Sequence, residues 1–217
     1  MDPDQKTIIW DWNGTLLDDI HLSMNAINVV LKKRTLPLLN IDRYRNIFGF
    51  PIREYYQRIG FDFSKEPFDI PAQEYIQEYY THVHECSLHE QALDTLSHFR
   101  QKGYRQFVLS AMEQSSLEMT LKQQNIFHFF EKVAGLDNHH AASKLDVGKR
   151  LLKTSHIENS NTWFIGDTTH DFEVASDMEC HCILIAKGHQ SEERLKSTGA
   201  PVVQDIKSLV KILCYPS

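Results

Sequence analysis

Short apolar runs alternate with amphipathic stretches along most of this chain. The apolar runs have the length of buried strands and stand at 7–10, 106–109, 132–134, 162–165, 182–185 and 202–203. Between them, apolar residues recur at helical spacing in 89–102, 115–124, 143–154, 171–178, 191–197 and 206–213. Strands and helices that alternate in this way predict an α/β fold built on a parallel sheet.

One long stretch, from about residue 18 to residue 86, breaks this alternation. Its first part places Ile20, Met24, Ile27 and Leu31 at helical spacing, a second helix is expected over 52–59, and a tyrosine-rich third helix ends near Glu85. We find no strand pattern there. The sequence therefore predicts an all-helical cap at 18–86, inserted into a core formed by residues 1–17 and 87–217.

Length and charge exclude several classes of protein. The 217 residues suffice for one core domain with a small insert. The net charge of −6 argues against a general affinity for nucleic acid, which needs a basic face. No apolar stretch approaches the roughly 20 residues of a membrane helix, and the polar start does not resemble a signal peptide. We expect a cytoplasmic monomer or homodimer with reduced cysteines and neither nucleic-acid nor membrane partners.

Three polar residues directly follow predicted strands: Asp11, Ser110 and Asp167. Lys144 opens a predicted helix, with Lys132 and Lys149 as nearby rivals. The carboxyl ends of parallel strands face one crevice, so these side chains are expected to converge. Carboxylates suit Mg²⁺ and can attack phosphorus, whereas an ammonium and a hydroxyl suit phosphoryl oxygens.

The order and spacing of these residues resemble the four motifs of the haloacid dehalogenase-like superfamily. The matching segments are Asp11-Trp12-Asn13-Gly14-Thr15, Ser110, Lys144 and Gly166-Asp167-Thr168-Thr169-His170-Asp171. The helical insert stands where the phosphoglycolate-phosphatase-like branch of this superfamily has its cap. The resemblance implies a Rossmann-like parallel-sheet core with a helical cap that covers the crevice.

The resemblance also implies a role for each motif residue. Asp11 would attack phosphorus and become an aspartyl-phosphate. Mg²⁺ would be bound by Asp11, Asp167 and the backbone carbonyl of Asn13, while Asp171 supports the metal shell or orients Lys144. Catalytic work would fall to Asp11, Asn13, Ser110 and Lys144.

Substrate contacts are expected from both parts of the chain. In the core, the resemblance implies contacts from Gly14, Thr15, Ser110, Ala111 and Lys144. In the cap, Arg45, Arg53 and Tyr56 are possible contacts, and we select Arg53 because an arginine can pair with an anionic substrate. The tyrosines Tyr75, Tyr79 and Tyr80 are interpreted as cap packing.

Position 13 departs from the family pattern. Phosphatases of the family usually carry a second Asp there, which protonates the leaving alcohol, and an amide cannot transfer protons in this way. Several outcomes fit: substrates with good leaving groups, such as acyl or aryl phosphates, cleavage of a different bond, or a proton from Asp18, Asp19 or a loop histidine. Cleavage of a carbon–phosphorus bond would need a Schiff-base lysine in the cap. Lys32 and Lys33 lie there, but no feature of the sequence distinguishes either of them.

The leading hypothesis is a Mg²⁺-dependent phosphatase that acts on a small phosphorylated metabolite. The alternatives are a phosphotransferase, a hydrolase of another bond and a non-catalytic sensor of a phosphate ligand. Two further motifs are interpreted as structural. Cys180-His181-Cys182 lacks the ligand spacing of a zinc site, and His139-His140 is expected in a solvated loop near Lys144.

Overall fold

The structure is a computed structural model that describes residues 5–136 and 143–214. The His139-His140 pair lies outside the described residues. A six-stranded parallel sheet forms the centre of the larger lobe, in the order β5-β4-β1-β6-β7-β8. Its strands are β1 (Thr7–Trp10), β4 (Arg105–Glu113), β5 (Lys132–Leu136), β6 (Thr162–Gly166), β7 (His181–Ile185) and β8 (Val202–Val203). The predicted α/β fold with a parallel sheet is confirmed.

Strand β1 lies in the middle of the sheet and is buried on both faces. Its Trp10 is in register with Val108 of β4 on one side and with Ile165 of β6 on the other. Successive side chains of a strand point to opposite faces. Accordingly Ile8 and Trp10 belong to one apolar cluster and Ile9 to another.

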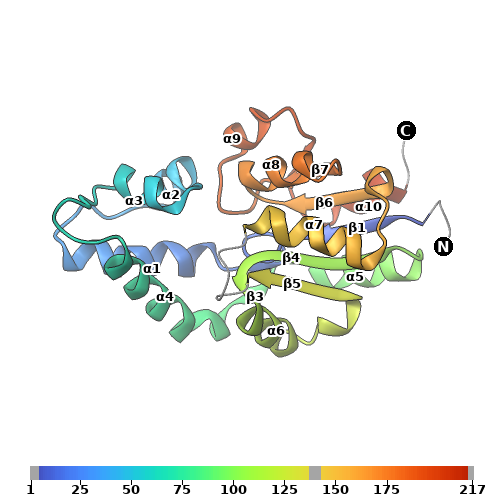
Figure 1. Ribbon diagram of the computed structural model, residues 1–217, viewed down its shortest axis with the longest axis horizontal. Coiled ribbons are helices and arrows are strands. Elements are labelled where there is room, and N and C mark those ends of the chain that lie inside the picture. Colours follow the sequence, from blue (N-terminus) through green and yellow to red (C-terminus); the bar gives the residue numbers. More distant parts are fainter. Residues whose placement is uncertain (1–4, 137–142, 215–217) are drawn as a thin grey trace.

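Helices cover both faces of the sheet (Figure 1). The face of Ile8 and Trp10 packs against α5 (Ala92–Gln101), α6 (Gln114–Gln123) and α10 (Ser208–Cys214). The opposite face packs against α7 (Lys144–Ser155) and α8 (Thr169–Asp177). A short helix, α9 (Glu192–Lys196), follows β7. This arrangement leaves the carboxyl ends of the strands free to form a site.

The smaller lobe is helical and lies to one side of the sheet, at the left of Figure 1. It consists of α1 (Ile20–Lys33), α2 (Ile41–Ile47), α3 (Ile52–Arg58) and α4 (Asp69–His82). These helices bury a core of their own that includes Ile27, Leu31, Tyr44 and Tyr56. Helix α2 was not expected; it begins where the side chain of Asn40 accepts a hydrogen bond from the backbone N–H of Arg43 (2.8 Å).

A two-stranded antiparallel ribbon joins the lobes. It pairs β2 (Leu17–Asp18) with β3 (Ser87–Leu88), with Leu17 opposite Leu88. The expectation of no strand in this region is therefore wrong at its first residue, because two residues are too few to show a hydrophobic period. Strand β4 also runs past its predicted end, so Ser110 lies within the strand. Within residues 5–136 and 143–214, no helix combines the length and apolar character needed to cross a membrane.

Candidate active site

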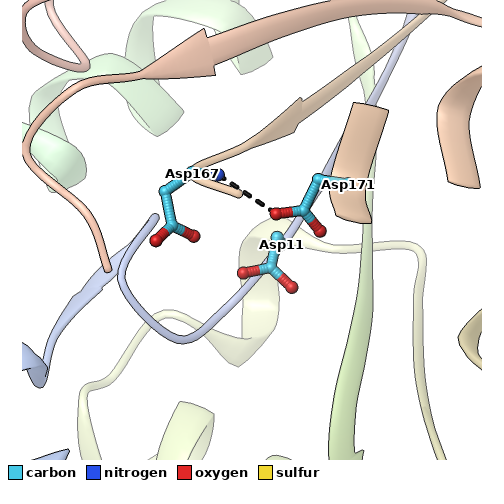
Figure 2. Close-up of side chains that lie close together, drawn as sticks. All are labelled: Asp11, Asp167 and Asp171. Atoms are coloured by element: carbon cyan, nitrogen blue, oxygen red, sulfur yellow. Dashed lines mark hydrogen bonds between the residues drawn. The ribbon is translucent and has the colours of Figure 1, made fainter. Parts of the chain in front are cut away.

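Three carboxylates meet at the carboxyl ends of β1 and β6. Asp11 directly follows β1, Asp167 directly follows β6, and Asp171 lies in the first turn of α8. Figure 2 shows the three side chains directed toward one region, and one oxygen of each lies within 4.8 Å of the others. Asp171 is fixed by a capping box, in which its Oδ2 accepts hydrogen bonds from the N–H (3.0 Å) and the hydroxyl (2.7 Å) of Thr168.

Lys144 lies directly against this cluster. It is the first residue of α7, and its buried ammonium donates to Asp11 Oδ1 and to Asp171 Oδ1, the latter at 2.6 Å. Its rival Lys132 is exposed and donates instead to the hydroxyl of Thr154 (2.7 Å). Lys144 is therefore the lysine that the structure brings to the carboxylates.

The buried cluster holds more negatively charged than positively charged side chains. Burial, together with the nearby Asp171 and Asp167, raises the pKa of Asp11 to about 8 despite the opposing Lys144 ammonium. Burial also raises the pKa of Asp167 to about 6. Burial alone would raise the pKa of Asp171, but Lys144 and Thr168 outweigh it and hold that pKa below its usual value. Three carboxylates that one ammonium does not neutralise fit a hard divalent cation with oxygen ligands, such as Mg²⁺.

The turn after Asp11 fits closely against Asp167. Gly14 has a φ of +73°, and a Cβ there would come within 2.4 Å of Asp167 Oδ2, so this position requires glycine. The hydroxyl of Thr15 donates to Asp167 Oδ1 (3.0 Å). Gly14 and Thr15 thus position the Asp167 carboxylate against the turn that follows Asp11.

The Asn13 side chain lies at the cavity wall, and its amide makes two hydrogen bonds. Its amide Nδ2 donates to Asp19 Oδ2 (2.9 Å) and to the hydroxyl of Tyr79 (2.7 Å). The same Asp19 carboxylate accepts from the backbone N–H of Gly14 (2.8 Å) and from the Tyr79 hydroxyl (2.7 Å). The side chain at position 13 is therefore part of a polar network around Asp19.

His189 completes this network, and the sequence did not reveal it. It follows β7 in a loop; its Nε2 lies 3.2 Å from Asp19 Oδ1, and its Nδ1 lies 2.9 Å from the hydroxyl of Tyr44 in α2. Burial alone would lower the pKa of His189, but Asp19, followed by Asp167 and Asp11, raises it to about 9. The backbone N–H of His189 donates to Asp167 Oδ2 (2.6 Å), which ties this loop to the carboxylate cluster.

The same loop is tied to α2 by further contacts. The guanidinium of Arg45 donates to the carbonyl oxygens of Lys187 (3.0 Å) and Gly188 (3.1 Å). In return, Arg194 donates to the carbonyl oxygens of Arg45 (3.2 Å) and Phe48. Arg45 is thereby engaged with core backbone, and it is not available to a substrate in this arrangement.

A cavity of about 430 Å³ opens between the carboxylate cluster and the helical lobe. Asp11, Asn13, Ser110, Ala111, Lys144, Asp167 and Asp171 all contribute to its wall. The hydroxyl oxygen of Ser110 accepts from the N–H of Met112 (3.0 Å), and among residues 5–136 and 143–214 its proton has no acceptor. Tyr56, Tyr75, Tyr79 and Tyr80 also line this space, so the tyrosines of α4 are more than internal packing.

Arg53 is not brought to this cavity. Its side chain is exposed, with the guanidinium over the rings of Phe63 (4.8 Å) and Phe68 (5.7 Å). It is absent from the described residues that form the cavity wall. The helical pattern alone could not show which face of α3 turns outward. Arg53 therefore lies outside the proposed site.

Comparisons with known proteins identify the family of this chain. The sequence model of the haloacid dehalogenase-like hydrolase family matches residues 8–185, and the chain belongs to this family of hydrolases. A phosphoglycolate phosphatase of Aliivibrio fischeri is 22% identical over 97% of this chain and 97% of its own length. A phosphoglycolate phosphatase of Caulobacter vibrioides is 27% identical over 91% of this chain and 85% of its own length.

Solved structures show the same fold. A haloacid dehalogenase-like hydrolase from Streptococcus pneumoniae superimposes with a TM-score of 0.84 at 22% identity, over 95% of this chain and 97% of that one. A putative phosphoglycolate phosphatase from Lactobacillus delbrueckii subsp. bulgaricus superimposes with a TM-score of 0.78 at 17% identity, over 96% and 98% of the two chains.

Proposed function

We propose that this hydrolase is a Mg²⁺-dependent phosphatase of small phosphorylated compounds and that Asp11 is its nucleophile. The observation that carries the proposal is the buried set of Asp11, Asp167 and Asp171 with the Lys144 ammonium bound to two of the three. A carboxylate can attack phosphorus when neighbouring positive charge binds the phosphoryl oxygens. Phosphoglycolate phosphatase is the name of two relatives of low identity, which supports phosphatase chemistry.

Each residue of the site would have its own role in this reaction. Mg²⁺, when bound, neutralises charge on the phosphoryl oxygens; Asp11, Asp167 and the Asn13 carbonyl would hold it, and Asp171 would support that shell while it orients Lys144. One Asp11 oxygen attacks phosphorus, the bond from phosphorus to the leaving oxygen breaks, and an aspartyl-phosphate forms. Ser110 and Lys144 donate to the phosphoryl oxygens. Water then releases phosphate and restores the carboxylate.

We also propose the division of labour between the lobes. Residues 1–17 and 87–217 would form the catalytic core, and residues 18–86 would form the cap that excludes water and selects the leaving group. The cavity between the two lobes supports this division because both contribute to its wall. A cytoplasmic location, as expected from the sequence, stays a proposal.

Phosphate release with two matched variants tests the proposal. Purified protein with Mg²⁺ is incubated with phosphorylated metabolites and an aryl phosphate, beside Asp11→Asn and Asp177→Asn. We expect Asp11→Asn to lose about 10³-fold or more of the activity. Asp177→Asn, which removes an exposed carboxylate at the end of α8, should retain it. Equal activity of wild type and Asp11→Asn would contradict the nucleophile assignment.

The environment of Asn13 favours phosphotransfer as a second candidate. Its amide is bound to Asp19 and Tyr79 and offers no base to activate water, so an aspartyl-phosphate at Asp11 would persist. A persistent phosphoenzyme can pass its phosphoryl group to a second acceptor. Acid quenching after mixing with an aryl phosphate, followed by intact-mass measurement, distinguishes the cases. Accumulated phosphoenzyme that added alcohols discharge would support transfer; the absence of accumulation would support hydrolysis alone.

A further inference from the structure

The wall of the cavity that faces the carboxylate cluster is mostly apolar. Helices α2, α3 and α4 and the turns beside them contribute aromatic and aliphatic side chains, among them Phe48, Phe50, Tyr55, Tyr75, Ile76 and Tyr80. Several of these rings contact one another, such as Phe48 with Tyr55 at 5.3 Å between centroids. Flat apolar surfaces of this kind bind flat apolar ligands, because burial of carbon surface and ring-to-ring packing both contribute.

No cation in the described wall of the cavity is available to a second anionic group of the substrate. Among the described residues of its wall, only Lys144 and His189 are basic. Lys144 is paired with Asp11 and Asp171, and His189 is paired with Asp19. A substrate carboxylate, such as the one in phosphoglycolate, would therefore be buried against aromatic rings without a free cation among the described residues of the wall, which is costly.

The proton supply imposes a second, independent limit on the leaving group. The Asn13 amide donates to Asp19 and Tyr79, and it has no proton that it can transfer. Both ring nitrogens of His189 are occupied, by Tyr44 and by Asp19. Of the described residues of the cavity wall, neither Asn13 nor His189 therefore has a free proton to give to the leaving group. A leaving group that departs without a proton must be stable as an anion, which describes a phenol oxygen and not an alkyl alcohol.

We propose that the substrate is a phosphate monoester of an uncharged phenol, with its ring against the aromatic wall of the cavity. This inference rests on the proposed phosphatase function and specifies its substrate class. In the first step, Asp11 Oδ bonds to phosphorus, the bond from phosphorus to the aryl oxygen breaks, and the electron pair leaves with that oxygen as a phenolate. The phenolate takes a proton from water after release, and hydrolysis of the aspartyl-phosphate yields phosphate.

Binding of unreactive phosphonates tests the inference without requiring turnover. With Mg²⁺ present, calorimetry measures the Kd of methylphosphonate, benzylphosphonate and phosphonoacetate, which share one phosphoryl-like head. We expect benzylphosphonate to bind about tenfold or more tightly than methylphosphonate, because a buried ring adds apolar contact. We expect phosphonoacetate to bind no more tightly than methylphosphonate.

Two variants on one helix provide a matched comparison. Ile76 and Ile70 both belong to α4 and are 50% and 46% exposed, but only Ile76 lines the cavity. Ile76→Arg adds a cation to the cavity wall. It should therefore strengthen the binding of phosphonoacetate, relative to that of benzylphosphonate, by about tenfold. Ile70→Arg should leave the ratio of the two affinities unchanged.

The outcomes test the substrate class and the phosphatase function separately. If phosphonoacetate binds as tightly as benzylphosphonate, or if the two Arg variants behave alike, the aromatic substrate class is overturned and the phosphatase proposal stands. If none of the three phosphonates binds in the presence of Mg²⁺, the phosphoryl site itself is overturned, and the substrate class with it.

Discussion

Nε2 of His189, in the sheet lobe, lies 3.2 Å from Oδ1 of Asp19, the residue that precedes α1. Both side chains are buried, at 6% and 1% exposure. Burial alone would raise the pKa of Asp19, but His189 and the hydrogen bonds from Tyr79 and Asn13 hold it below its usual value. The pair therefore places opposite charges at the point where the helical lobe meets the sheet lobe.

Removal of one partner of this pair should destabilise the protein strongly. In His189→Leu, the Asp19 charge stays buried without its cation, and we expect unfolding to become easier by about 3–5 kcal/mol. Asp19→Asn in the same background should recover part of this loss. Urea denaturation of the two single variants and the double variant measures the coupling energy.

The solvent-exposed His82–Glu85 contact provides the control cycle. Its side chains are 42% and 62% exposed, and their distance of 3.0 Å is similar to that of the buried pair. We expect no resolvable coupling there because water screens the charges. Equal coupling in the two cycles would show that the His189–Asp19 contact does not form as described.

The pair also predicts how stability depends on pH in metal-free protein. The pKa of His189 is raised from 6.5 to about 9 in the folded state, so folding favours the protonated ring. Its stabilising contribution is complete below about pH 6.5 and is lost as the pH rises through about 9. We expect the Tm difference between wild type and His189→Gln, measured in chelator, to shrink over this window. A difference that stays constant from pH 6 to pH 10 would contradict the prediction.

Substitution of Asn13 should change the reaction according to the leaving group. In Asn13→Asp, the new carboxyl lies beside Asp19, since the present amide is 2.9 Å from it, and a like charge at this distance favours the protonated form. A protonated Asp can act as a general acid. We expect hydrolysis of benzyl phosphate to rise about 10²-fold, with a much smaller change for phenyl phosphate. Steady-state phosphate release measures both; an equal effect on the two substrates would argue against a missing acid.

Divalent cations should stabilise the folded protein through the carboxylate cluster. Asp11, Asp167 and Asp171 form the site only when folded, so Mg²⁺ at about 100 times its Kd should add about 2.7 kcal/mol to the free energy of unfolding. Asp167→Asn should lose most of this gain, and Asp177→Asn should keep it. Thermal unfolding with and without chelator is the measurement. An identical gain in all three proteins would place the ion elsewhere.

The sequence predicted the fold class and the residues that follow its central strands. Strand β1 and strand β6 are continuous apolar runs, because a central parallel strand is buried on both faces, and Asp11 and Asp167 follow them directly. Lys144 and Asp171 come from helix starts with visible capping residues. These local signals are enough to bring four charged side chains to one crevice, and their catalytic roles stay proposals.

Other parts of the site carry no local signal. His189 lies in a loop after β7, where neither hydrophobic period nor capping pattern exists, and its partner Asp19 is distant in sequence. Arg53 shows the opposite case, since a plausible substrate contact turns out to lie over Phe63 on the outside of the lobe. Long-range pairing and the rotation of a short helix about its axis are both decided by tertiary packing.

The ribbon of β2 and β3 brings the two ends of the helical lobe together. The chain leaves the sheet lobe through Leu17 and returns through Leu88, and these two residues are paired neighbours. Loop closure between them therefore requires no rearrangement of the central strands. The helical lobe is nevertheless part of the site, because its Asp19 pairs with His189, whose backbone N–H donates to Asp167. Any other insert joined at Leu17 and Leu88 would have to supply an equivalent of Asp19 to keep the carboxylate cluster in its present arrangement.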